Sequence, residues 1–368
     1  MNDSLQDMMR EATRLTQAGH LTEATQLIQR ALSASKPPMG PTASPASKAS
    51  PDSPVPAQSV VIDGVILRRG VEVDPPDAEV NTAGEFISGS HTHAGLTRSY
   101  KLYVPGAHAG RALPLVVMLH GCTQDADDFA AGTEMNVRAR EQGFFVLYPV
   151  QSEDGNAQRC WNWFSRAHQQ RGSGEPALLA DMTQSVSKRY GIDLDRVFIA
   201  GLSAGGAMAD IVASAYPEIY AAVGIHSGLP RGAATNVAGA FAAMKNGEPT
   251  SRSLARATHA TVPSIIFHGD ADQTVHPKNG EQVIAALLRG VASSEPRVEQ
   301  GAASGGRSYT RTIYRASGGD TLAEHWLVKG AGHAWSGGSA KGSYTDASGP
   351  DATGEMLRFF LSHPRRSN

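Results

Sequence analysis

A short apolar run, Val197–Ala200, leads directly into the hexad Gly201-Leu-Ser-Ala-Gly-Gly206. The glycines on both sides of Ser203 permit a sharp turn from a strand into a helix, because a side chain at either flank would collide with the neighbouring strand or helix. The residues that follow, Met208–Ala215, contain no proline and favour a helix. The segment therefore predicts a strand, a tight turn and a helix, with Ser203 at the turn. The alternative is an ordinary loop of glycine and serine.

Continuous apolar runs alternate with helical segments along much of the chain. Such runs are typical of strands that are buried on both faces of a parallel sheet. We expect strands at 60–67, within 84–104, and at 114–120, 143–149, 197–200, 221–225, 264–268, 310–315 and 325–329, and helices at 127–142, 176–190, 208–215 and 352–362. This order predicts an α/β fold with a doubly wound, mostly parallel sheet, whose ligands bind beyond the carboxyl ends of the strands.

The sequence divides into three parts. Residues 1–33 carry apolar side chains at helical spacing with a break at Gly19-His20, which predicts an amphipathic helical hairpin similar to one tetratricopeptide-like pair. Residues 34–58 are rich in serine, proline and alanine, and we expect a disordered linker there because so few apolar side chains cannot offset the ordering entropy. We expect residues 59–368 to form the α/β domain. A single helix pair cannot bury its own apolar face, so we expect the hairpin to dock elsewhere or to bind a partner.

Net charge and hydropathy exclude two classes of partner. The formal net charge is −2, so the chain has no basic field that would attract nucleic acid. No run of about 18 apolar residues occurs, so we expect no membrane span. The N-terminus lacks the basic, apolar and small-residue order of a secretory signal, so either export is absent or a leader has been removed.

Two cysteines, Cys122 and Cys160, are too few for a disulfide scaffold or a structural zinc site. They form either one bridge or two free thiols. The pair His91-Thr-His93 could suggest metal ligation, but without nearby acids or cysteines we expect these histidines to be solvated. No metal is implied, and no dinucleotide-binding pattern occurs, so we expect no cofactor.

A nucleophilic serine needs a histidine to accept its proton and an acid to orient that histidine. In an α/β-hydrolase both follow the serine along the chain, on loops after strands. His333 follows a predicted strand and lies among flexible glycines. Three other histidines fit this role less well: His276 is too close to the acids, His325 opens the preceding strand, and His363 is near the C-terminus. Two acids, Asp270 and Asp272, follow the strand at 264–268. Alternation cannot separate them, because both point to the same face.

Ester or amide hydrolysis through a serine also needs two N–H groups that face the developing oxyanion. One is expected from Ala204, directly after the serine, and the other from the loop that follows the strand at 114–120. In that loop we assign the N–H of Cys122. His120 either braces the loop or donates to the oxyanion itself.

Aromatic residues near these loops are candidates for substrate contact. Trp161 and Trp163 flank the Cys160 loop, and Trp335 follows His333 by two residues. Aromatic walls suit an apolar acyl or aryl group, so we expect at least one of these tryptophans to line the cleft. The alternative is that Trp161 and Trp163 alternate on a short strand, with one in the core and one at the rim.

Taken together, these motifs resemble the polyhydroxybutyrate (PHB) depolymerase family of esterases over about Ser99–Phe360. The segments that carry the resemblance are Leu119–Gln124 with Asp127–Phe129, Arg159–Phe164, Gly201–Gly206, His268–Val275 and Gly332–Ser336. The resemblance implies an α/β-hydrolase fold and a catalytic triad of Ser203, Asp272 and His333. It selects Asp272 because the family's acid stands in a His-Gly-x-x-Asp-x-x-Val pattern.

The resemblance also implies a metal-independent serine esterase that acts through an acyl-enzyme on hydroxyalkanoate oligoesters or related small and aryl esters. Feruloyl, acetyl-xylan and synthetic polyester substrates are alternatives within the same chemistry. A serine peptidase, and a non-catalytic binding protein that acts through its N-terminal helices, are alternatives of other classes.

Members of this family are often secreted and degrade extracellular polymer, and the present sequence departs from them in two ways. It shows no signal peptide, and no polymer-adsorbing module is recognisable after Phe360. A cytoplasmic location is therefore the alternative to secretion, and soluble oligomers are easier substrates than crystalline polymer. For the helices of residues 1–33 we then expect binding either to a partner protein or to a granule surface.

Overall fold

The computed structural model describes residues 84–106, 108, 110–247 and 262–365. The predicted hairpin of residues 1–33, the linker of residues 34–58 and the strand at 60–67 lie outside the described residues. The description below therefore concerns the predicted catalytic domain.

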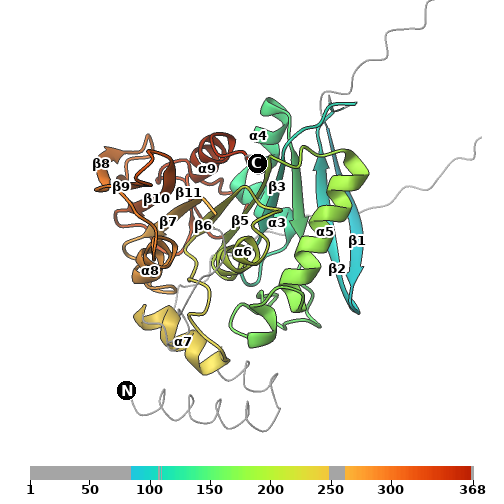
Figure 1. The fold of residues 1–368 in the computed structure, drawn as a ribbon, viewed down its shortest axis with the longest axis horizontal. Helices are drawn as coiled ribbons and strands as arrows, with labels where there is room; N and C mark the ends of the chain where they lie inside the picture. Colours follow the sequence, from blue (N-terminus) through green and yellow to red (C-terminus); the bar gives the residue numbers. More distant parts are fainter. Residues whose placement is uncertain (1–83, 107, 109, 248–261, 366–368) are drawn as a thin grey trace, which may run out of the picture. The chain divides into compact units, whose positions relative to one another are not determined.

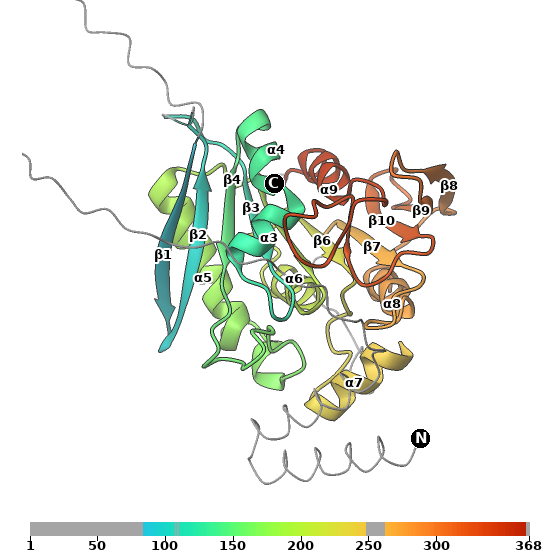
Figure 2. The ribbon, with the colours of Figure 1, turned by 180° about the vertical axis from the view of Figure 1, so that it is seen from behind.

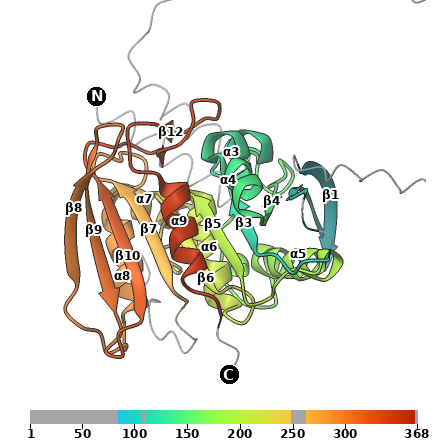
Figure 3. The ribbon, with the colours of Figure 1, turned by 90° about the horizontal axis from the view of Figure 1, so that it is seen from above.

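A ten-stranded sheet forms the centre of this domain, with strand order β1-β2-β4-β3-β5-β6-β7-β10-β9-β8 (Figure 1). The six strands from β4 to β10 in this order pair in parallel, while β1, β2, β9 and β8 pair antiparallel at the two edges (Figure 3). The strands are β1 (Glu85–His93), β2 (Leu96–Val104), β3 (Leu115–Leu119), β4 (Phe145–Pro149), β5 (Val197–Leu202), β6 (Ala222–His226), β7 (Ser264–Gly269), β8 (Arg297–Ala302), β9 (Ser308–Arg315) and β10 (Thr321–Val328). The predicted α/β fold with a mostly parallel sheet is confirmed.

Helices cover both faces of the sheet (Figures 1 and 2). One face carries α5 (Gly174–Tyr190), α6 (Ala204–Ala215), α7 (Val237–Asn246) and α8 (Lys278–Leu287), and the other carries α3 (Ala126–Thr133), α4 (Met135–Gln142) and α9 (Ala352–Leu361). Successive residues of β5 alternate between the two apolar cores, with Ile199 in the first and Phe198 in the second. Such alternation is why the central strands are apolar at every position.

The structure differs from the sequence prediction between residues 127 and 142. A single helix was expected, but Glu134 adopts a left-handed conformation (φ 53°) and separates α3 from α4. The carbonyl of Gly132 accepts the Ser339 N–H at 2.8 Å, and the carbonyl of Thr133 accepts the Thr353 hydroxyl at 2.7 Å. These two carbonyls bond to the C-terminal part of the chain, so α3 ends there.

Candidate active site

Ser203 occupies a strained turn between β5 and α6. Its backbone has φ 56° and ψ −118°, a region that non-glycine residues rarely adopt. Strain of this kind costs roughly 1–3 kcal/mol and persists only where the surroundings hold the residue in place. The Ser203 N–H donates to the carbonyl of His226 at 2.9 Å, and the residue is 8% exposed. The turn therefore holds a nearly buried serine hydroxyl at the carboxyl end of β5.

Two glycines allow this turn to pack against the next strand. A Cβ atom at Gly205 would overlap the carbonyl oxygens of Leu119 and His120, and one at Gly201 would overlap the backbone of Gly205. The start of α6 thus lies directly against the end of β3. The collision expected from the sequence for any side chain at these glycines is present in the structure.

Asp272 and His333 meet through a direct hydrogen bond. The Nδ1 atom of His333 lies 2.7 Å from Oδ2 of Asp272, and Oδ1 of Asp272 accepts the N–H groups of Thr274 and Val275, each at 2.9 Å. Asp270 faces elsewhere, since its carboxylate accepts the Gly330 N–H at 2.7 Å. Of the two acids that strand alternation could not separate, Asp272 is the one that contacts His333.

The environment of Asp272 favours its ionised form. Burial alone would raise the pKa of this carboxyl group, but the side chains of His268 and His333, together with the backbone N–H of Val275, hold the pKa well below its usual range. An ionised Asp272 accepts a hydrogen bond from the Nδ1–H group of His333, which leaves Nε2 of His333 unprotonated and able to act as a base.

No hydrogen bond joins Ser203 to His333 among the residues that the structure describes. Nucleophile and base contacts of this kind are often long in ligand-free sites and shorten when substrate binds. The loops that carry the two residues are nevertheless tied together by His226, the last residue of β6. Its carbonyl holds Ser203, and its Nε2 atom accepts the Ser336 N–H at 2.9 Å, three residues after His333.

His226 is buried between two aromatic rings. It stacks on Phe267 and Trp335 with ring centroids 5.7 and 5.1 Å apart. Burial, with the charges of His268 and His333, lowers the pKa of His226 to about 3. The ring is therefore neutral near pH 7, with Nε2 as an acceptor and the proton on Nδ1, 3.2 Å from the Ser227 hydroxyl. His226 was not predicted as a site residue. It directly follows the predicted strand at 221–225, which is the kind of position that pointed to His333.

The N–H groups of Cys122 and Ala204 are both available for an oxyanion. Neither has a hydrogen-bond partner in the described part of the chain, whereas the neighbouring Thr123 N–H donates to Gln158 at 2.7 Å. A Cβ atom at Gly121 would lie 3.6 Å from the carbonyl oxygen of Leu202, so the loop after β3 lies beside the turn at Ser203. The geometry is compatible with the predicted pair of donors.

His120 does not face the oxyanion position. Its Nδ1 lies 2.8 Å from the Gly121 carbonyl, and its Nε2 accepts the Gln151 N–H at 3.1 Å. Desolvation by burial lowers the pKa of His120 to about 4, so the ring is neutral near pH 7. Because both ring nitrogens are occupied, the expectation that His120 donates to the oxyanion is wrong. Its contacts are those of the other expectation, a brace for the loop.

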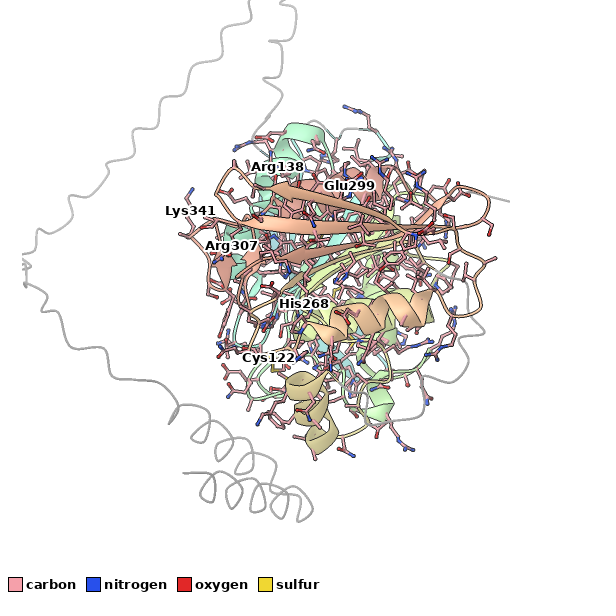
Figure 4. The ribbon with its side chains drawn as sticks, turned by 90° about the vertical axis from the view of Figure 1, so that its left-hand side faces the viewer. Cys122, Arg138, His268, Glu299, Arg307 and Lys341 are labelled. Atoms are coloured by element: carbon pink, nitrogen blue, oxygen red, sulfur yellow. A yellow bond between two sulfur atoms is a disulfide. The ribbon has the colours of Figure 1, made fainter. Side chains whose placement is uncertain are left out.

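A disulfide joins Cys122 to Cys160 in the structure, with an S–S distance of 2.02 Å and neither cysteine free. The bridge connects the loop that carries the Cys122 N–H to the loop that follows β4. Figure 4 shows Cys122 and the buried His268, which follows Phe267 in β7. The loop after β3, which we call the oxyanion loop because it holds the N–H predicted to face the oxyanion, is therefore cross-linked at Cys122.

A buried polar network supports the second of these loops. Glu175, at the start of α5, is fully buried and accepts hydrogen bonds from Gln151 and from the backbone and side chain of Asn162, the latter two at 2.8 Å. Arg98 lies 3.4 Å from the same carboxylate. Gln151 also donates its own N–H to His120. The network thus connects α5 to the oxyanion loop, and no local sequence signal distinguished Glu175 or Gln151 from surface residues.

The three candidate tryptophans lie inside the fold. Trp161, Trp163 and Trp335 are 0%, 4% and 1% exposed. Trp335 packs edge-to-face on Phe129 and donates from Nε1 to the Thr353 hydroxyl at 3.0 Å. Contacts from distant elements enclose these rings, so none of the three presents an exposed face, and their contact with substrate stays a prediction.

The two histidines at 91 and 93 also differ from expectation. They lie on β1 and each contacts an acid, since Asp181 of α5 lies 2.7 Å from His91 and 3.2 Å from His93.

Within the described ranges no group of three or more histidines, cysteines or acids has an arrangement that would hold a metal ion. No described helix is long and apolar enough to span a bilayer.

Comparison with known proteins extends the similarity beyond the site. The sequence matches the family described as Esterase PHB depolymerase over residues 98–305, more than half of the chain. It is 31% identical to poly(3-hydroxyalkanoate) depolymerase C of Paucimonas lemoignei over 258 residues, which cover 67% of this chain and 60% of that protein. It is 30% identical to a probable acetylxylan esterase A of Aspergillus clavatus over 196 residues, covering 49% of this chain and 62% of that protein. The chain thus spans about three fifths of the length of these relatives.

A solved structure shares the fold. The acetyl xylan esterase from Aspergillus awamori has a TM-score of 0.60 and 22% sequence identity, with 75% of this chain and 99% of that chain covered. This likeness shows that the two chains share a fold.

Proposed function

Because the chain belongs to the family of PHB depolymerase esterases, we propose that it hydrolyses carboxylic esters with Ser203 as the nucleophile. The hydrogen bond from His333 Nδ1 to Asp272 carries this proposal, because it joins two loops of the sheet at the end where the strained Ser203 lies. The triad order Ser203, Asp272 and His333 along the chain is the order that this fold uses.

The first half of the reaction forms an acyl-enzyme. Ser203 Oγ attacks the ester carbonyl carbon while its proton moves to Nε2 of His333. The negative charge that develops on the carbonyl oxygen lies between the N–H groups of Cys122 and Ala204, which are otherwise without partners in the described chain. Asp272 stabilises the positive charge on His333. The C–O bond then breaks, and His333 donates the proton to the departing alcohol.

The second half releases the acid. Water takes the place of the alcohol, His333 removes its proton, and the resulting hydroxide attacks the acyl carbon. The bond to Ser203 Oγ breaks, and the serine recovers its proton from His333. No step needs a metal or a cofactor, since the triad supplies both the nucleophile and the proton transfers.

We further propose hydroxyalkanoate oligoesters as the substrate class. The Paucimonas lemoignei relative is named a poly(3-hydroxyalkanoate) depolymerase, and the alignment with it covers more of this chain than the alignment with the acetylxylan esterase. Acetylated xylan is the alternative that the second relative supports.

The test compares wild type with Ser203→Ala on p-nitrophenyl butyrate. Loss of the nucleophile is expected to lower kcat by roughly four to six orders of magnitude. A fluorophosphonate probe should label wild type at Ser203, as read by mass spectrometry of the tryptic peptide. Ser214→Ala, in the helix α6 that follows Ser203, is the matched control and should retain wild-type kcat and labelling.

Ester hydrolysis that survives in Ser203→Ala, or labelling at another residue, would contradict the assignment. The substrate class is tested with a 3-hydroxybutyrate trimer, acetylated xylan and a peptide p-nitroanilide. A higher kcat/KM for acetylated xylan would move the substrate class to the alternative, and amide cleavage as fast as ester cleavage would indicate a peptidase.

A further inference from the structure

Tyr344 is an exposed aromatic residue in a strained conformation. Its side chain is 45% exposed, and its backbone φ is 51°, in the left-handed region. It lies directly before the short strand β12 (Thr345–Asp346), which pairs with β11 (Trp335–Ser336). A tyrosine in this region is unusual, and an outlier of this kind points to a constraint imposed by the surroundings or by function.

The backbone of Tyr344 is attached to the loop of the catalytic histidine. Its carbonyl accepts the Trp335 N–H at 2.6 Å, two residues after His333. Because β11 and β12 continue this pairing, the position of Tyr344 depends directly on the His333 loop.

The preceding residue attaches the same segment to the oxyanion loop. Ser343 donates its N–H and its hydroxyl to Asp128 at 2.8 and 2.6 Å, and its carbonyl accepts Gln124 Nε2 at 3.2 Å. The amide oxygen of Gln124, Oε1, accepts the Gly121 N–H at 2.9 Å, within the loop that carries Cys122. The segment therefore lies between the two loops of the site.

The phenol of Tyr344 reaches the same oxyanion loop. Its hydroxyl oxygen lies 3.2 Å from the Thr123 hydroxyl, next to Cys122. Farther along, an ion pair between Arg307 and Asp346 anchors the far side of the segment, and Figure 4 shows Arg307 and Lys341 at this end of the domain. The ring is thus held beside the loop that carries Cys122, with one hydrogen bond and 45% of its surface exposed.

Other large apolar side chains that are exposed in the described residues are aliphatic: Val137, Leu194, Val298 and Leu361. The tryptophans of the site are buried, so they do not offer a comparable surface at the entrance. An aromatic ring with a hydroxyl presents both an apolar face and a hydrogen-bonding tip. Hydroxyalkanoate oligoesters alternate short alkyl segments with ester groups, and therefore match both parts of this side chain.

We propose that Tyr344 is a specificity-determining residue that binds the part of an oligoester extending beyond the ester bond under attack. Its ring packs against the alkyl segment of the next unit, and its hydroxyl leaves Thr123 to donate to the carbonyl oxygen of the next ester group. Acetate esters are too short to reach it. This inference rests on the proposed function, because it assumes that Ser203 attacks the ester.

The experiment measures kcat and KM for a 3-hydroxybutyrate trimer and for p-nitrophenyl acetate. Tyr344→Ala is expected to lower kcat/KM for the trimer by about tenfold, mainly through KM, and to change the acetate value by less than about twofold. Tyr344→Phe, which keeps the ring, should retain most of the preference. Tyr344→Gly removes the ring while it tolerates the positive φ, so it should show the same selective loss without a lower thermal midpoint.

Leu194→Ala is the matched control, because Leu194 is 58% exposed and precedes β5 at the opposite end of that strand from Ser203. It should leave kcat/KM unchanged for both substrates.

Three results would each overturn the inference: equal losses of kcat/KM on both substrates in Tyr344→Ala and Tyr344→Gly, no loss on the trimer, or a wild type without preference for the trimer. If Ser203→Ala remains active, the proposed function itself fails. If that variant is inactive while the Tyr344 variants match wild type, only this inference fails.

Discussion

Replacing His226 with phenylalanine tests how the serine and histidine loops are held together. Phenylalanine keeps a ring between Phe267 and Trp335, but it cannot accept the Ser336 N–H that lies 2.9 Å from His226 Nε2. A buried N–H without a partner costs about 1–3 kcal/mol. We therefore expect His226→Phe to lower the free energy of unfolding by about 2 kcal/mol at pH 7.5.

The size of this effect should depend on pH. The pKa of His226 is about 3 in the folded protein and about 6.5 in the unfolded chain, so acid favours the unfolded state, which binds the proton more readily. The contribution of His226 is fully present above pH 6.5 and is lost as the pH falls towards 3. At pH 5 the free energy of unfolding of the wild type should be about 2 kcal/mol lower through this group. The reason is that pH 5 lies about 1.5 units below the unfolded pKa, and each unit corresponds to about 1.36 kcal/mol. Phenylalanine does not titrate, so the two proteins should become nearly equal in stability at pH 5.

Urea unfolding followed by tryptophan fluorescence at pH 7.5 and pH 5 measures both quantities. Ile225→Val serves as the control, since Ile225 is the buried neighbour in β6 and its substitution should cost about 1 kcal/mol at both pH values. A difference between His226→Phe and wild type that is the same at both pH values would refute the argument that His226 is held neutral. A difference below about 0.5 kcal/mol at pH 7.5 would refute the importance of its hydrogen bond.

Two further predictions concern the acid and the disulfide. Asp272→Asn should lower kcat on p-nitrophenyl butyrate by about 10³–10⁴-fold, whereas Asp270→Asn should stay within a few fold, because Asp270 contacts Gly330 and Lys329 instead of His333. Equal losses in the two variants would contradict the assignment of the acid. Cys160→Ala should lower the free energy of unfolding by up to about 4 kcal/mol, because the bridge to Cys122 closes a loop with a sequence separation of 38. An unchanged urea midpoint in the variant would show that this bridge does not stabilise the fold. The same conclusion would follow if dithiothreitol lowered the free energy of unfolding of wild type and variant by equal amounts.

The sequence predicted those features that depend on local pattern. Apolar runs identified the buried central strands, and glycines at 201 and 205 identified the turn at Ser203. The strand β8 and the helices α7 and α8 were not predicted. In β8 the side chains are mostly exposed, so its residues lack the apolar alternation that marks a half-buried strand.

Features that depend on contacts between distant segments could not be predicted. The break between α3 and α4 follows from hydrogen bonds with Ser339 and Thr353, about 200 residues away along the chain. The burial of Trp335 depends on Phe129 in the same way. Local pattern shows that a tryptophan is near His333 but does not show which elements cover it.

The choice between Asp270 and Asp272 shows where the alternation rule ends. Both follow β7, which stops at Gly269, so the two acids lie in a turn and no longer share a face. The Asp272 N–H donates to the Gly269 carbonyl at 3.3 Å, and this turn directs the carboxylate back to His333. The family motif selected Asp272 as the acid. The hydrogen bond to His333 gives the physical reason why the acid stands at that position of the motif.

The close packing of Gly205 on the carbonyls of Leu119 and His120 separates two kinds of control over the enzyme. The place of the serine is determined by backbone against backbone, so exchange of side chains at the entrance leaves it unchanged. The segment that contains Tyr344 is attached partly through its backbone, to Trp335, and partly through side chains such as Asp128 and Gln124. If Tyr344 acts as proposed, substitutions in that segment change which esters bind while the backbone position of Ser203 stays the same.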